Sequence, residues 1–323
     1  MFKKMNLKTL LIILVVVLGV YLILDYTGDN ERNFKSQLTS FDKDDVTRIE
    51  YYKKGDYENS IIITRKNNGW FVDKDNNEYP ADSNRVKRMI DLLHNLKVDR
   101  VEAKNKERWK KYKVSDSLST RVKMYAGEEL LTDIHLGKFS FSQPPKQQKM
   151  QQQRRRSRQN MTTFVRLAGE QPVYGVKGLL SMSFPENVGQ LRDKTIVEAK
   201  GSINRIKFSG KYNYALNSTS GRWMVDSQPA DSATAASYVN ILKSVKGSAF
   251  ADVQESALGK PAQTAVIERT NDESITIKAY EAPSNINSDY IINSTANSEA
   301  WFTDKRNLFS RIFKERAHFL KDK

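Results

Sequence analysis

The chain has 323 residues and a mass of 37.1 kDa, which favours two domains because one domain commonly spans about 100–150 residues. It contains no cysteine and only three histidines. Disulfide scaffolds, thiolate zinc sites and cysteine nucleophiles are therefore excluded, and a histidine-based metal centre has little material. The formal net charge of +15 is concentrated near the amino terminus and in residues 97–113, 146–158 and 305–323, so the remainder is predicted to be nearly neutral.

The amino-terminal segment is the first predicted element. Leu10–Leu24 is a run of fifteen uncharged, mostly apolar residues. With its flanks, the segment Leu7–Tyr26 would extend roughly 30 Å as a helix, which is the thickness of a bilayer core. Residues 1–27 are therefore predicted to be a cytoplasmic start and a transmembrane anchor, and residues 28–40 a linker. Two alternatives stay open, namely a cleaved signal peptide and the buried core helix of a soluble protein.

The charges around this segment predict its orientation. Lys3, Lys4 and Lys8 lie at or before the apolar run, and no basic residue follows it before Arg32. Positive flanks stay on the cytoplasmic side of a membrane, so the N-terminus is predicted to be cytoplasmic. The predicted location is the cytoplasmic (inner) membrane, with a single-pass anchor and the bulk of the chain periplasmic or otherwise extracytoplasmic.

Three short motifs occur twice in the same order, which indicates an internal duplication. The first motif alternates apolar and polar residues at strand period, the second contains a tryptophan followed by valine and aspartate, and the third begins a helix with an Asp-Ser cap. The paired segments are Val46–Tyr51 with Ile203–Phe208, Asn68–Asp73 with Gly221–Asp226, and Pro80–Ser83 with Pro229–Ser232.

The helix that follows each third motif has the same apolar face in both copies. Apolar residues recur at i, i+3, i+4, i+7 and i+10, which is the spacing of one helix face. The first copy contains Val86, Met89, Ile90, Leu93 and Leu96, and the second contains Ala235, Tyr238, Val239, Leu242 and Val245 at a constant offset of 149 residues. The two helices are therefore predicted to be equivalent.

Strand hairpins are predicted after each helix, over 120–136 in the first copy and 265–280 in the second. Strands that precede and follow one helix predict an antiparallel sheet with the helix on one face. The predicted fold class is α+β, with an N-terminal transmembrane helix followed by two tandem copies of an antiparallel-sheet-plus-helix module. The first repeat is expected over 41–200, and the second over 201–323 with a basic C-terminal helix.

A basic, glutamine-rich loop over 143–160 interrupts the first repeat only. Its functional interpretation is contact with an anionic lipid, an acidic polymer or an acidic partner, and the alternative is a solvated insertion that serves solubility. Nucleic acid is not a predicted partner, because the loop has no aromatic residue to stack on bases and the domain is expected outside the cytoplasm. The expected contact residues are Lys146, Lys149, Arg154, Arg155, Arg156 and Arg158.

The sequence contains no motif that carries a known chemistry. Asp73–Asn77 begins like a calcium-binding loop, but Glu78 stands where the sharp turn needs glycine and Asn84 where a bidentate glutamate is needed. No serine-nucleophile elbow, phosphate-binding loop or zinc-binding helix motif occurs. The chain is therefore predicted to be no enzyme and to have no catalytic residue, cofactor or metal site.

The histidines and the paired tryptophans have ordinary structural interpretations. His94, His135 and His318 are predicted to be surface residues. Trp70 and Trp223 occupy the same position of the two copies, which favours core anchors over a pair that stacks on a ligand.

Four motifs in a fixed order resemble a bacterial family. They are F-D-x-x-D-V-x-x-I (Phe41–Ile49), x-G-W-x-V (Asn68–Val72), P-A-D-S (Pro80–Ser83) and x-L-R-D-K-T (Gln190–Thr195). From about Phe41 onward the chain is similar to the family called domain of unknown function 4340. It departs from the family pattern at Tyr112–Asp116, where a Tyr-Gly-Leu-Asp-Pro segment is expected. The resemblance implies an envelope protein, sometimes encoded beside components of ABC-type transport systems related to gliding machinery, and it supplies no catalytic residues.

The sequence thus favours a single-pass, membrane-anchored extracytoplasmic protein that acts by binding. We expect an accessory or scaffold subunit of an envelope complex, for which an ABC-type transport or gliding-related assembly is the partner that the resemblance implies. The alternative is an extracytoplasmic carbohydrate-binding protein or a hydrolase that uses carboxylates whose proximity the sequence does not reveal.

Overall fold

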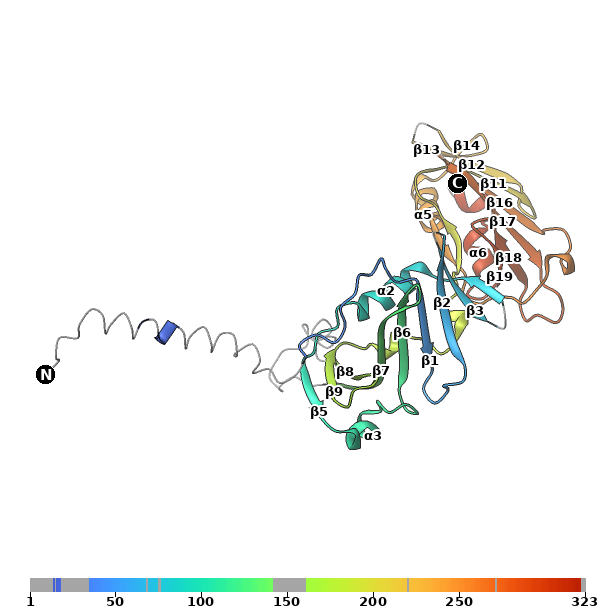
Figure 1. The fold of residues 1–323 in the computed structure, drawn as a ribbon. Coiled ribbons are helices and arrows are strands. Elements are labelled where there is room, and N and C mark those ends of the chain that lie inside the picture. Colours follow the sequence, from blue (N-terminus) through green and yellow to red (C-terminus); the bar gives the residue numbers. More distant parts are fainter. Residues whose placement is uncertain are drawn as a thin grey trace. The chain divides into compact units, whose positions relative to one another are not determined.

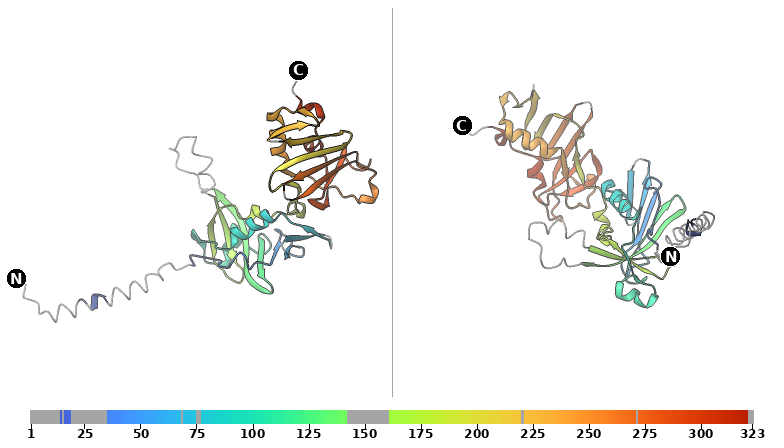
Figure 2. Two further views of the ribbon diagram at one scale, coloured as in Figure 1. Left: turned by 90° about the horizontal axis from the view of Figure 1, so that it is seen from above. Right: turned by 90° about the vertical axis from the view of Figure 1, so that its left-hand side faces the viewer.

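The chain forms two compact units (Figures 1 and 2). Unit 1 comprises residues 1–78 and 83–188, and unit 2 comprises residues 79–82 and 189–323. The computed structural model describes Leu14, Val16–Leu18 and residues 35–67, 69–74, 77–141, 161–219, 221–270 and 272–320. The boundaries predicted from the sequence, 41–200 and 201–323, stay predictions.

The first sheet is antiparallel, with strands in the order β4-β3-β2-β1-β6-β7-β8-β9-β5. Its strands are β1 (Arg48–Tyr52), β2 (Ser60–Lys66), β3 (Gly69–Lys74), β4 (Asn77–Pro80), β5 (Arg100–Ala103), β6 (Thr120–Ala126), β7 (Glu129–Phe141), β8 (Met161–Leu167) and β9 (Val173–Lys177). The helical elements are α2 (Ser83–Leu93), η1 (Lys106–Arg108), α3 (Trp109–Tyr112) and η3 (Ser181–Ser183). Alternate residues of β1 are buried, as the apolar alternation of its sequence predicts.

The second sheet has the strand order β14-β13-β12-β11-β16-β17-β18-β19. Its strands are β11 (Ile203–Gly210), β12 (Tyr214–Thr219), β13 (Arg222–Val225), β14 (Gln228–Pro229), β16 (Gln263–Arg269), β17 (Asp272–Glu281), β18 (Tyr290–Ser294) and β19 (Asn297–Thr303). A separate pair is formed by β10 (Thr195–Glu198) and β15 (Ser244–Lys246). The helical elements are η4 (Val188–Gln190), α5 (Ser232–Leu242), η5 (Glu255–Ala257), α6 (Leu308–Ile312) and η6 (Arg316–Phe319).

The two strand orders correspond strand for strand over eight positions, from β4 and β14 at one edge to β9 and β19. The helices α2 and α5 have 11 residues each and stand between equivalent strands. All ten predicted apolar positions are buried, and the first four of each copy form the buried face of α2 or α5, which confirms that part of the prediction. Leu96 and Val245 are buried beyond the ends of the helices. The predicted cap is confirmed in the second copy, where the Asp231 carboxylate accepts a hydrogen bond of 2.8 Å from the Thr234 backbone N–H.

Both faces of the first sheet are covered where β7, β8 and β9 meet. One face carries the main core, and on the other face residues from the segment before β6 form a small apolar cluster with β8 and β9. The cluster consists of Tyr112, Val114, Phe164 and Val173. As a result, five consecutive residues of β8, Thr162–Arg166, are buried. A strand covered on both faces loses the alternation of exposed and buried residues.

The predicted α+β class is wrong. The part of the chain that the structure describes is mostly β-sheet, with 44% strand against 19% helix. The pattern located α2 and α5, which have 11 residues each, but the described residues also form sheets of nine and eight strands, and strand therefore predominates. The predicted basic C-terminal helix consists only of the short elements α6 and η6, because Leu308, Phe309, Ile312 and Phe319 pack into the core of unit 2.

The predicted transmembrane anchor, and with it the predicted inner-membrane location, is also corrected. Within the described residues, no helix has both the length and the apolar character that crossing a bilayer requires. Of the predicted span Leu7–Tyr26, only Leu14 and Val16–Leu18 are described, and these are helical. The rest of that segment lies outside the described residues.

Candidate functional site

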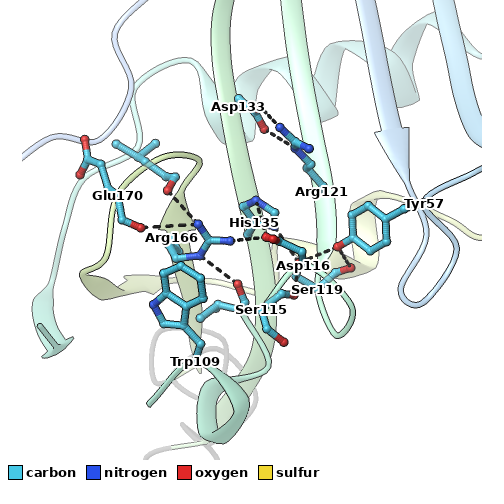
Figure 3. A network of polar contacts seen from close by, with 12 residues as sticks. Tyr57, Trp109, Ser115, Asp116, Ser119, Arg121, Asp133, His135, Arg166 and Glu170 are labelled. Atoms are coloured by element: carbon cyan, nitrogen blue, oxygen red, sulfur yellow. Dashed lines mark hydrogen bonds and ion pairs between the residues drawn. The ribbon is translucent and has the colours of Figure 1, made fainter. Parts of the chain in front are cut away.

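A network of polar side chains lies on the outer face of the first sheet, where residues 112–119, just before β6, cross it (Figure 3). We name these residues the crossing segment. The sheet contributes Arg121 from β6, His135 from β7 and Arg166 from β8. The crossing segment contributes Asp116 and Ser119. Because the segment covers this face, His135 and Arg166 are only 2% and 3% exposed. The interpretation of His135 as a surface residue is therefore wrong.

Arg166 fastens the crossing segment to the sheet. Its Nε donates a hydrogen bond of 3.0 Å to the Val114 carbonyl, and its Nη2 lies 2.7 Å from Asp116 Oδ1. Its guanidinium also lies 3.8 Å from the ring centre of Trp109, a cation–π distance. Burial lowers the pKa of Arg166, and the Asp116 carboxylate opposes that shift. A buried guanidinium with these partners holds the crossing segment in one position.

Ser119 contacts His135, and His135 contacts Asp116. A catalytic triad has the same order of groups, namely a nucleophile, a base and a carboxylate. Ser119 Oγ is 2.9 Å from His135 Nδ1, and His135 Nε2 is 3.5 Å from Asp116 Oδ1. The carboxylate favours the tautomer with hydrogen on Nε2, so Nδ1 accepts the hydroxyl hydrogen bond. Burial, with a smaller contribution from Arg166, lowers the pKa of His135 to about 4. The imidazole is therefore neutral at pH 7.

The environment of Ser119 does not suit nucleophilic catalysis. The residue is completely buried, and its Oγ also lies 2.9 Å from the Ser115 carbonyl and 3.0 Å from the Tyr57 hydroxyl. A nucleophile must reach its substrate, and a general base works best with a pKa near the working pH. Of the three side chains Ser119, His135 and Asp116, only that of Asp116, which is 74% exposed, faces solvent. The arrangement fits a structural fastening.

A groove of about 750 Å³ lies elsewhere in unit 1, between the segment before β1, the strands β2 and β3, and α2. We name it the Phe41 groove. Its lining consists of Phe41, Asp42, Lys43, Asp44, Arg65, Trp70, Ser83, Lys87, Ile90, Asp91 and His94. Residues of three motifs that carry the family resemblance thus meet in one place, although they are far apart in the sequence.

Hydrogen bonds attach the segment before β1 to the elements on either side. The Phe41 backbone N–H donates 3.3 Å to the His94 carbonyl, and His94 Nδ1 is 3.3 Å from the Phe41 carbonyl. On the other side, Arg65 Nη1 donates 3.0 Å to the Asp44 carbonyl. Residues 35–40, which were predicted to belong to a linker, include the buried Leu38 and Thr39. The groove therefore has a fixed wall on this side.

The groove has a rim of mixed charge. Lys43 pairs with Asp91, and this ammonium lowers the pKa of the Asp91 carboxyl group. Lys87 is exposed on α2, and Trp70 is half-buried. Paired opposite charges beside one indole ring suit a polar ligand that also has an apolar face.

The residues that the sequence singled out have different outcomes in the structure. Lys146, Lys149, Arg154, Arg155, Arg156 and Arg158 lie outside the described residues, so the predicted anionic contact stays a prediction. Trp223 packs against the core of unit 2, as predicted, whereas Trp70 lines the Phe41 groove. His318 is exposed and His94 is half-buried beside Phe41. Among the described residues, no group of three or more acidic or histidine side chains is placed to hold a metal ion.

Sequence reasoning missed Ser119, Asp116 and Arg166. The sequence of β8 contained one signal, since Arg166 stands between the apolar residues Phe164-Val165 and Leu167. An arginine within such a run indicates a buried partner, but the partner lies 50 residues away in the sequence.

Comparison with known proteins gives one match. The sequence pattern of the family described as Domain of unknown function (DUF4340) matches residues 70–263, which is more than half of the chain. No curated protein and no solved structure matches it.

Proposed function

The chain belongs to the DUF4340 family, whose function is unknown, and from this premise we propose that it is a non-catalytic binding protein that recognises its partner through the Phe41 groove. Its role is that of an accessory or scaffold subunit of a protein complex. The ABC-type transport or gliding-related assembly that the family resemblance implies is the first partner to test.

The observation that carries this proposal is the composition of the groove. The motifs Phe41–Ile49, Asn68–Val72 and Pro80–Ser83 each contribute lining residues, although they belong to different elements, namely β1, β3 and the start of α2. A surface assembled from several separate segments is typical of recognition sites, since loops and element ends on a rigid scaffold bear function. Both charges are present on the rim, which suits a polar protein segment better than a purely apolar one.

A carbohydrate ligand is the second candidate, and Trp70 favours it. An indole ring beside Asp42, Asp44 and Asp91 offers a stacking face and hydrogen-bond acceptors for sugar hydroxyl groups. Hydrolysis has less support. A glycosidase needs a carboxylic acid with a raised pKa, whereas Lys43 lowers that of Asp91.

Photo-crosslinking from α2 tests the proposal in cells that produce the full chain. A photoreactive phenylalanine analogue replaces Lys87, which lines the groove, or in the control Arg88, which is equally exposed but does not line it. We expect a crosslinked protein partner from position 87 and none from position 88.

The affinity of the purified partner then provides the quantitative readout. Lys87→Glu reverses a charge on the rim and should weaken binding about tenfold, or about 1.4 kcal/mol, whereas Arg88→Glu should change it less than about twofold. Equal effects of the two variants would contradict a role of the groove. A glycan that binds the chain and is lost on Trp70→Ala, without any crosslinked protein, would favour the second candidate.

A further inference from the structure

A second groove in unit 1 arises because β7 is longer than its neighbour β6. In the antiparallel register, Thr120 at the start of β6 pairs with Leu136 of β7. Beyond Leu136, β7 continues to Phe141, where it pairs only with β8. The side that faces β6 is therefore vacant along Lys138–Phe141. Among the described residues no strand pairs with it there.

This vacant side opens into a groove of about 510 Å³, which we name the β7 notch. Residues from both faces of β7 line it, so it follows the strand edge and not one face of the sheet. Its lining comprises Lys53, Lys54, Lys113, Leu118, Thr120, Leu136, Gly137, Lys138, Phe139, Ser181, Met182, Phe184 and Glu186.

Within the described residues, the backbone groups of the vacant stretch that point away from β8 have no hydrogen-bond partner. In an antiparallel ladder, every second residue directs both its N–H and its C=O to the same neighbouring strand. For Lys138–Phe141, the neighbour on the β8 side is present, and the backbone of these four residues forms no hydrogen bond to any other described segment. An exposed strand edge of this kind is a template for an additional strand.

The side chains around the notch determine what the added strand must carry. Four lysines and a single glutamate line it, and none of Lys53, Lys54, Lys113 and Lys138 forms an ion pair with a described residue. Apolar surface lies between the charges, since Phe139 is 40% and Met182 is 68% exposed. The notch thus combines unpaired positive charge with exposed apolar side chains.

We propose that the β7 notch binds an extended acidic segment of a partner protein, which adds as a strand to β7 at Lys138–Phe141 through backbone hydrogen bonds. Alternate acidic side chains of the segment face the lysines, and the apolar side chains between them contact Phe139 and Met182. The chain's own residues 142–160 lack the acidic composition that this occupant requires, since they contain six basic and no acidic residues. The proposal is independent of the Phe41 groove.

A blocked, fluorescein-labelled peptide of alternating glutamate and apolar residues, EFEVEF, is the probe. Fluorescence anisotropy with the purified full chain should show saturable binding. A second probe of the same sequence carries N-methyl groups on alternate backbone nitrogens, which removes hydrogen-bond donors and leaves the charge unchanged. We expect the methylated probe to bind at least about tenfold more weakly. Equal binding of the two probes would overturn strand addition.

Two double variants with the same change of charge test the location. Lys54→Glu with Lys113→Glu alters the notch, and Lys104→Glu with Lys110→Glu alters exposed lysines outside it. The first pair should weaken binding of the unmethylated probe at least about tenfold, and the second less than about twofold. Equal losses would show general attraction by a basic protein and would overturn the site.

Hydrogen exchange and vesicles give two further outcomes. Addition of the probe should slow exchange at the backbone amides of 138–141, and unchanged exchange there would contradict the proposal. Binding to phosphatidylglycerol vesicles that competes with the probe and exceeds it in affinity would assign the notch to an anionic lipid instead.

Discussion

Burial of His135 and Arg166 depends on a segment that covers the outer face of the sheet. His135 has the alternation of a solvent-facing strand residue, yet Ser119 and Asp116 reach it from the crossing segment. Arg166 is held by the same segment, through Val114 and Asp116. A histidine in this position is surrounded by Arg166, Arg121, Asp116 and Asp133, and burial is the main cause of its lowered pKa. We therefore expect this contact between the crossing segment and the sheet to weaken in acid.

The first prediction concerns the dependence of stability on pH. In the folded chain the pKa of His135 is about 4, against about 6.5 for an exposed histidine. The unfolded chain therefore binds the proton more readily between these values, and the free energy of unfolding should decrease as pH falls from about 6.5 to 4. The loss due to His135 should be about 3 kcal/mol.

Urea denaturation at pH 7, 5.5 and 4.5 measures this effect, and His135→Asn should flatten the decrease. Asparagine keeps a polar atom near the position of Nδ1 and does not titrate. The control is His318→Asn, which changes an exposed histidine and should leave most of the decrease in place. A decrease of the same size in the His135 variant would contradict the assignment.

At the scale of elements, the close approach of β7 and the crossing segment depends on a glycine. A β-carbon on Gly137 would lie 2.3 Å from the Tyr112 carbonyl oxygen and 2.7 Å from a methyl group of Val114. Both distances are shorter than van der Waals contact, and a backbone oxygen cannot rotate away. Gly137 therefore allows the crossing segment to pass directly over β7, where β6 has not yet begun.

The second prediction tests this contact by Gly137→Ala. Overpacking against a fixed carbonyl should lower the free energy of unfolding by about 2 kcal/mol, or more if the segment shifts. Faster hydrogen exchange is expected in residues 112–119, because the segment must move outward. Gly259→Ala is the control, since a β-carbon there has no atom within 4 Å. An unchanged exchange pattern in the Gly137 variant would show that the contact is dispensable.

At the scale of the whole chain, the duplicated fold has diverged in its connections. In the first copy β5 joins the sheet beside β9, whereas in the second copy the corresponding β15 pairs with β10 outside the large sheet. The first copy also bears the crossing segment, the Phe41 groove and the β7 notch. The second copy repeats the buried positions of the helix face, including Leu242 at the position of Leu93. Both binding sites that we propose thus lie in unit 1.

The third prediction uses the two equivalent leucines. Leu93 and Leu242 are both completely buried at the same turn of α2 and α5. Leu93→Ala and Leu242→Ala should each cost about 2–5 kcal/mol, because each leaves a cavity in the core of its own copy. Hydrogen exchange should accelerate mainly within unit 1 for the former and within unit 2 for the latter. Equal acceleration of both units by either variant would indicate a single cooperative unit.

The sequence alone determined the repeated elements and the family. Helical spacing located both helix faces, since a 3.6-residue period is a local property of the chain, and motif order identified a DUF4340 member. The tertiary structure decided the class, because long antiparallel pairings outnumber the helices, and it decided where His135, Arg166 and Trp70 lie. The residues that surround these side chains come from segments distant in the sequence. A local sequence pattern does not show which segment covers a face of the sheet, or where one strand extends beyond its neighbour.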